Sequence, residues 1–203
     1  MPTQGTLRHI RRIQGITIAW MSVEAVLSLW AAWKTRSPAL AAFGGDSAVE
    51  FFSAVVVLWR FLTHKSERAE QRAARIAGGL LFALATYVVL ASAVSLLGYS
   101  EPKPSYLGIA VLVGAALIMP VLAMEKRRLS AVTGSAALRA DAAESALCAY
   151  LSIIALAGLA VHAIWHIAWA DPVAALAITP LILFAAREAM RGKSCGCWPI
   201  LTQ

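Results

Sequence analysis

Long hydrophobic runs limit what this chain can fold into more than any other feature of its sequence. Six runs with few charged side chains lie at residues 13–33, 39–62, 74–97, 106–124, 140–161 and 172–190. A helix needs roughly 20 residues to cross the apolar core of a bilayer, which is about 30 Å thick. The sequence therefore predicts an all-α polytopic membrane protein, a bundle of six transmembrane helices.

The composition agrees with this fold class and leaves little room for another domain. Of the 203 residues, 60% are hydrophobic and 14% are charged, and a soluble domain with that ratio would expose large apolar patches. We expect residues 1–12 to form a cytoplasmic N-terminal segment, 13–190 the transmembrane domain and 191–203 a cytoplasmic tail. The first run is too long for a signal peptide and contains Glu24, so we expect it to be retained.

The distribution of Lys and Arg predicts the topology, because positive charge near helix ends resists translocation. With six alternating helices, one side holds only Lys34, Arg36 and Lys103. The other side holds Arg8, Arg11, Arg12, Arg60, Lys65, Arg68, Arg72, Arg75, Lys126, Arg127, Arg128, Arg139, Arg187, Arg191 and Lys193. We expect both termini in the cytoplasm, in a bacterial-type inner (plasma) membrane. Topology and anionic lipid explain the net charge of +7 better than a nucleic-acid partner does.

Five carboxylates lie in or beside the predicted spans: Glu24, Asp46, Glu50, Asp141 and Glu144. An ionisable group at that depth is costly, so each is a candidate functional residue that needs a partner. Asp46 and Glu50 are four residues apart and share one helix face. Asp141, Glu144 and Cys148 occupy positions i, i+3 and i+7, again within one stripe of a helix.

The two acidic stripes together predict a metal site. If they face each other, Asp46, Glu50, Glu144 and Cys148 offer three carboxylates and one thiolate, a ligand set that suits tetrahedral Zn²⁺ or a similar ion. Like charges in a low dielectric cannot all ionise, so protons and metal would compete for the same atoms. That competition is the physical basis of antiport.

Several polar residues near the spans leave alternatives open. Asp141 is either a solvated or salt-bridged residue beside Arg139, or an accessory residue of the metal site. Glu24 is a candidate hydrogen-bond donor, proton relay or additional ligand. His162 and His166 are four apart between tryptophans, which favours an interfacial belt over metal release.

The ends and connections carry weaker signals. Cys195 and Cys197 have two equally supported interpretations, as residues that transfer a soft metal or as part of a tail without a function in metal binding. We expect reduced thiols there rather than disulfides. His64 lies in a charged connection that we expect to be solvated. Asp171 before Pro172 predicts the N-cap of the last helix. Small residues at Gly78, Gly79, Gly108 and Gly114 indicate close packing of membrane helices.

Two segments resemble the metal-site segments of the cation diffusion facilitator (cation efflux) family. They are Gly44-Gly45-Asp46-Ser47-Ala48-Val49-Glu50 and Leu138-Arg139-Ala140-Asp141-Ala142-Ala143-Glu144, the second continuing to Cys148. The resemblance spans essentially the whole membrane portion. It implies that Asp46, Glu50, Glu144 and Cys148 are the metal ligands, that the protein is a homodimer, and that Zn²⁺ is exchanged for protons.

The chain departs from the usual pattern of that family in three ways. Glu144 replaces a His and Cys148 replaces an Asp, which leaves Cd²⁺, Fe²⁺, Co²⁺ and Mn²⁺ open beside Zn²⁺ as the transported metal. The chain ends soon after the last predicted span, so we expect a short form without the C-terminal cytoplasmic domain. A His-rich loop is also missing.

We therefore expect a divalent metal cation transporter that works by proton-coupled alternating access, with efflux as its direction and no prosthetic group. The alternative is a non-transporting metal-binding or scaffold membrane protein, whose acids satisfy one another as protonated hydrogen-bond partners. An enzyme is not expected, because the spans contain no His-Glu-x-x-His pair and no Ser or Cys with a nearby His base.

One geometric conflict accompanies this prediction. Asp46 lies about 8 residues, or roughly 12 Å, from the outer start of its helix, whereas Glu144 lies about 20 residues from the outer end of its own. For the two to meet at one depth, the helix of Glu144 must project beyond the membrane or tilt.

Overall fold

The protein is a bundle of six helices in the computed structural model, which describes residues 4–63, 67–134 and 136–190. The elements in these ranges are α1 (Gln4–Thr35), α2 (Pro38–Thr63), α3 (Glu67–Leu96), α4 (Tyr106–Thr133), α5 (Ala136–Trp165) and α6 (Ala170–Met190). Each predicted hydrophobic run lies within one of them, except that Leu97 falls one residue beyond α3. The all-α fold class is confirmed, whereas the division of the chain into three segments stays a prediction.

Five of the helices are long and apolar enough to cross a membrane: α1, α3, α4, α5 and α6. Large apolar side chains on them, such as Val26, Leu117 and Ile153, are exposed in the single chain. A soluble protein rarely presents so much apolar surface, so these helices indicate an integral membrane protein. α2 is not among these five when only its described residues are considered. That α2 is a sixth transmembrane span stays a prediction.

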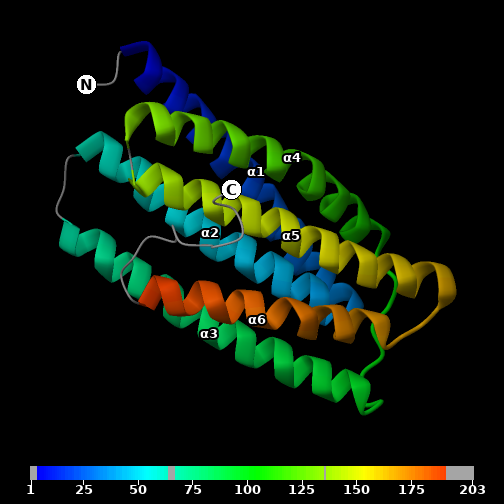
Figure 1. Cartoon of the computed structure of the whole chain (residues 1–203). Helices are drawn as coiled ribbons and strands as arrows, with labels where there is room; N and C mark the ends of the chain where they lie inside the picture. Colours follow the sequence, from blue (N-terminus) through cyan, green and yellow to red (C-terminus); the bar gives the residue numbers. More distant parts are fainter. Residues whose placement is uncertain (1–3, 64–66, 135, 191–203) are drawn as a thin grey trace.

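The helices alternate in direction along the bundle (Figure 1). The start of α1 and the ends of α4 and α6 lie at one end, which we call the N-terminal end. The α1–α2 turn, the α3–α4 connection and the α5–α6 turn lie at the opposite, distal end. α2 packs against α1, α3, α5 and α6, so the helix that carries Asp46 and Glu50 occupies the centre.

Small residues allow the helices to approach closely. A methyl group on Gly44 would lie 2.9 Å from Ser28 Cβ of α1, and one on Gly78 would lie 2.9 Å from the Ala186 carbonyl oxygen of α6. The expected packing role is confirmed for Gly78, Gly108 and Gly114, and it is wrong for Gly79, where an added methyl group meets open space.

Asp171 ties two helix starts together at the distal end. Its Oδ1 accepts hydrogen bonds from Ser37 Oγ at 2.9 Å and from the Ala39 backbone N–H at 3.2 Å. Because α6 already begins at Ala170, Asp171 lies inside its first turn and instead satisfies a free N–H at the start of α2. The prediction of a structural cap is confirmed, but the helix that it caps was predicted wrongly.

The length of α5 resolves the conflict of depth. Trp165, the last residue of α5, is 17 residues beyond Cys148, about 25 Å along the axis. Pro38, the first residue of α2, is 8 residues before Asp46, or about 12 Å. Figure 1 shows α5 continuing past the α1–α2 turn. The two acidic stripes therefore meet because α5 projects beyond α2 at the distal end.

Candidate metal centre

Three of the four predicted ligands come together between α2 and α5. One ligand atom each of Asp46, Glu50 and Cys148 lies within 4.8 Å of the other two. The side chains are buried, with 7%, 6% and 0% of their surfaces exposed. Ligand atoms around a tetrahedral metal ion are roughly 3–4 Å apart at normal bond lengths, so small side-chain movements would bring all three to one cation.

The helical period explains why these residues converge. Asp46 and Glu50 stand one turn apart on α2, and the stripe of α5 that carries Cys148 packs against that face. Between them lies Ser47, whose Oγ is 4.0 Å from Cys148 Sγ and also donates to the Phe43 carbonyl. The sequence contains no signal that separates Ser47 from the other small residues of this helix.

Glu144 is on the same stripe as Cys148 but is not part of this group. Its side chain is half-buried and lies within electrostatic reach of Asp46, Asp141 and Lys126. The structure thus brings together three of the predicted ligands. The fourth, Glu144, lies one helical turn before Cys148 on α5.

Glu24 lies fully buried on α1, on the side of the site formed by that helix. Neither of its carboxylate oxygens makes a hydrogen bond of good geometry among the described residues. The Trp20 side chain is near enough to favour its charged form, and Asp46 acts on it as a like charge. A buried polar group without a partner is costly. The roles of hydrogen-bond donor, proton relay and additional ligand for Glu24 stay predictions.

A buried lysine is the main departure from the sequence prediction. Lys126 was expected among the cytoplasmic cations at the end of a span, but it is fully buried within α4. Its Nζ lies 2.9 Å from Asp141 Oδ1 and donates to Ser145 Oγ at 2.8 Å. Asp141 is thus salt-bridged, as one interpretation of the sequence proposed, but with Lys126 rather than with Arg139, which is exposed.

This ion pair is connected to the candidate metal centre. Ser145 Oγ donates to Glu50 Oε1 at 3.2 Å, and Gln14 Nε2 donates to Asp141 Oδ2. Sequence reasoning missed Gln14, Lys126 and Ser145. One signal was present: successive residues of a helix point about 100° apart, so the run Lys126-Arg127-Arg128 cannot keep all three side chains on one solvated face.

Comparison with known proteins identifies the family of the chain. The sequence profile of the cation efflux transmembrane domain matches residues 16–192. The chain belongs to the cation efflux family. The resemblance to cation diffusion facilitator transporters is confirmed at this level.

A curated relative of this cation efflux domain is the manganese efflux system protein MneS of Bacillus subtilis (strain 168). The two are 26% identical over 189 residues, which cover 88% of this chain and 65% of the relative. The chain thus spans a little less than two thirds of that protein's length.

The histidines of the cation efflux domain do not form the expected helical pair. α5 ends at Trp165, and His166 has a φ of 55° outside the helix. His162 is buried with no partner for Nδ1 among the described residues, whereas His166 is exposed. The i, i+4 geometry predicted for them is therefore wrong, and their interfacial role stays a prediction. His64, Cys195 and Cys197 lie outside the described residues.

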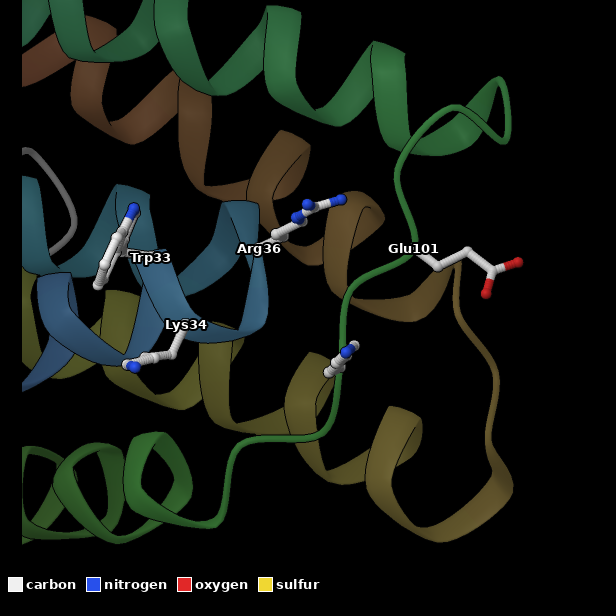
Figure 2. Close-up of a pocket in the computed structure, with 5 residues that line it drawn as sticks. Trp33, Lys34, Arg36 and Glu101 are labelled. Carbon is white, nitrogen blue, oxygen red and sulfur yellow. The ribbon is translucent and has the colours of Figure 1, made fainter.

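An open pocket of about 400 Å³ lies at the distal end of the cation efflux domain, beside the α1–α2 turn. It is lined by Trp33, Lys34, Arg36, Glu101 and Lys103, and Figure 2 shows that its labelled side chains point in different directions. Lys34 Nζ lies 5.4 Å from the ring centroid of Trp33. Because the polar groups do not converge, this pocket lacks the donor arrangement found between α2 and α5.

Proposed function

We propose that this cation efflux protein moves a divalent metal cation across a membrane in exchange for protons. The observation that carries the proposal is the convergence of Asp46, Glu50 and Cys148 within 4.8 Å of one another between two helices. Buried carboxylates in an apolar bundle are unfavourable unless they are paired or bind a cation. A bound divalent cation would offset two of the three negative charges that both carboxylates and the thiolate carry when they are ionised.

We propose Zn²⁺ as the preferred cargo. A thiolate beside carboxylates is a mixed soft and hard ligand set, which suits Zn²⁺ and Cd²⁺ better than Mn²⁺, whereas carboxylates alone suit Mn²⁺. Glu144 would complete a four-ligand shell by turning toward the site from one turn before Cys148 on α5. MneS is named for manganese efflux, so a direct comparison of Zn²⁺, Cd²⁺ and Mn²⁺ is the informative measurement.

Protons are the proposed counter-ions because the site cannot stay fully charged without metal. Asp46 and Glu50 are close in a low dielectric, and like charges there favour protonation of at least one carboxyl group. Metal binding would then release protons, and proton binding would release metal. Alternating exposure of the site to the two sides would turn this competition into exchange.

Direction and assembly complete the proposal. The positive charge gathered at the N-terminal end supports a cytoplasmic location for that end. The excess of Lys and Arg at this end remains when the buried Lys126 is not counted. Metal would load there and leave at the distal end, driven by proton entry. We further propose a homodimer, which a mass measurement in nanodiscs would test.

Flux in proteoliposomes tests the function. Vesicles with an internal Zn²⁺ indicator and an imposed pH gradient should take up Zn²⁺ through the wild-type protein, and Asp46→Ala should abolish uptake. Glu101→Gln at the distal pocket is the control, and it should transport normally. Helix content from circular dichroism would show that Asp46→Ala is folded.

If no divalent ion moves through folded wild-type protein, transport is refuted. The protein would then be a non-transporting metal-binding or scaffold membrane protein.

A further inference from the structure

A chain of polar contacts leads from α1 to the metal centre through the interior of the bundle. Gln14 donates to Asp141, Asp141 pairs with Lys126, Lys126 donates to Ser145, and Ser145 donates to Glu50. No member has more than 6% of its surface exposed. The contacts join α1, α4, α5 and α2, so the network connects four helices at the candidate ligand Glu50.

Lys126 is the only Lys or Arg that is buried among the residues whose burial the structure describes. We propose that it is a tethered counter-cation that positions Glu50 in the metal-free site and opposes metal binding. The inference rests on the proposed function and deepens it, because it assigns the residue that sets metal affinity and release.

The direction of the hydrogen bonds supports a positioning role. An ammonium group has three donors and no acceptor, so Ser145 Oγ must accept from Lys126. A serine hydroxyl has one proton, and here it points to Glu50 Oε1 at 3.2 Å. Lys126 therefore makes Ser145 a fixed donor, and Glu50 must present an acceptor oxygen to it.

The consequence for the metal is competition at one carboxylate. A cation that binds Glu50 must draw that oxygen from Ser145 and approach the positive charge behind it. Loss of this network should strengthen metal binding and slow metal release. Lys126 would act on the metal through Ser145 and through its charge, without touching the ion.

Two variants test the inference while avoiding a lone buried charge. Ser145→Ala removes the connection and leaves the Lys126–Asp141 pair intact. The double variant Lys126→Met with Asp141→Asn removes both charges together, because a single substitution would leave its partner unpaired inside the bundle. Lys126→Arg keeps the positive charge, and an arginine side chain, like that of lysine, donates hydrogen bonds but accepts none. Ser152→Ala is the matched control, since Ser152 is a buried serine of α5 that donates to the Ala149 carbonyl.

Zn²⁺ binding to the purified proteins, measured by titration calorimetry, gives the first readout and requires no transport. The double variant should lower the Kd by about tenfold or more. Of the two charges that it removes, Lys126 acts on Glu50 and repels the metal, whereas Asp141 is not among the charges that act on Glu50. Ser145→Ala should lower the Kd by a smaller factor. Lys126→Arg and Ser152→Ala should stay within about twofold of wild type on the same grounds.

Initial rates of Zn²⁺ uptake in proteoliposomes give the second readout. Ser145→Ala and the double variant should lower both the KM and the maximal rate. A protein that is only destabilised would show a lower maximal rate without a lower KM. Unchanged Kd values in both variants would overturn the inference, as would Lys126→Arg behaving like the double variant. If wild-type vesicles move no metal, the proposed function fails, and the Kd values still decide whether Lys126 opposes binding.

Discussion

Cys148 is the residue that most distinguishes the chemistry of the candidate metal centre. It is fully buried, and its sulfur lies close to both carboxylates of α2 and to Ser47. A thiolate binds Zn²⁺ and Cd²⁺ more strongly than it binds Mn²⁺, whereas carboxylates accept all three ions. Selectivity among divalent metals should therefore depend on this single atom.

Replacement of Cys148 by Asp should shift the metal preference. We expect the ratio of Cd²⁺ to Mn²⁺ uptake rates to fall by about tenfold, because a hard oxygen replaces the soft sulfur. Uptake of each metal into proteoliposomes, with Ser152→Ala as the control, measures the ratio. An unchanged ratio would show that Cys148 is a packing residue and not a ligand.

The carboxyl groups of Asp46 and Glu50 predict how pH affects transport. Protonated carboxyl groups do not bind metal, so low pH on the loading side should weaken binding. Raising that pH from about 6 to about 8 should lower the KM for Zn²⁺ as protons leave the site. Initial rates at fixed internal pH measure this effect. A KM that is independent of pH, or that rises with pH, would contradict proton competition at these residues.

At the level of helices, the site depends on how closely α1, α2 and α5 approach one another. Gly44 lies two residues before Asp46, and its missing side chain lets α1 pack against α2 at Ser28. α5 reaches the same depth because it extends beyond α2. The candidate ligands are therefore held on helices, and their spacing depends on the distance between those helices.

A methyl group at Gly44 tests this sensitivity. Gly44→Ala would place its Cβ 2.9 Å from Ser28 Cβ and 3.0 Å from the Leu29 backbone nitrogen, so α1 and α2 must separate. Overpacking of this kind typically costs about 1–3 kcal/mol. We expect a lower Tm in detergent and weaker Zn²⁺ binding.

Gly79→Ala provides the control for this measurement. An added methyl group there meets open space, and helix propensity favours Ala by about 1 kcal/mol. It should leave the Tm unchanged or raise it. Equal effects of the two substitutions would argue against a close α1–α2 contact.

The whole molecule is polarised in charge along its long axis. Exposed arginines lie at the N-terminal end, such as Arg11, Arg128 and Arg187, whereas the distal end carries Lys34, Arg36 and Lys103 around an open pocket. This asymmetry predicts a single orientation in the membrane, with the N-terminal end facing the cytoplasm.

Labelling of introduced cysteines tests the orientation. Tyr99 at the distal end is 82% exposed, and Val132 near the N-terminal end is 71% exposed. Tyr99→Cys should react with a membrane-impermeant maleimide in intact cells, whereas Val132→Cys should react only after the membrane is opened. The reverse pattern would invert the topology and with it the proposed direction of transport.

Much of this arrangement was predictable because it depends on local periodicity. The hydrophobic runs predicted the six helices. The spacing of Asp46 and Glu50 predicted that they share one face of a helix, and the spacing of Asp141, Glu144 and Cys148 predicted a shared stripe on another. Glu144 shares the stripe of Cys148 but is not in the group of three, because the position of a side chain across a helix interface depends on the rotation of each helix. His166 was misplaced because α5 ends one residue before it.

The sequence by itself determined which segments become helices and which residues lie one turn apart, since a helix of fixed period sets those neighbours. Only the tertiary structure decided that Lys126 turns inward to Asp141 and Ser145, and that α5 projects far enough to bring Cys148 to Asp46. These outcomes depend on the rotation and axial shift of one packed helix against another. Both quantities are set by the shapes and charges of side chains that are distant in the sequence.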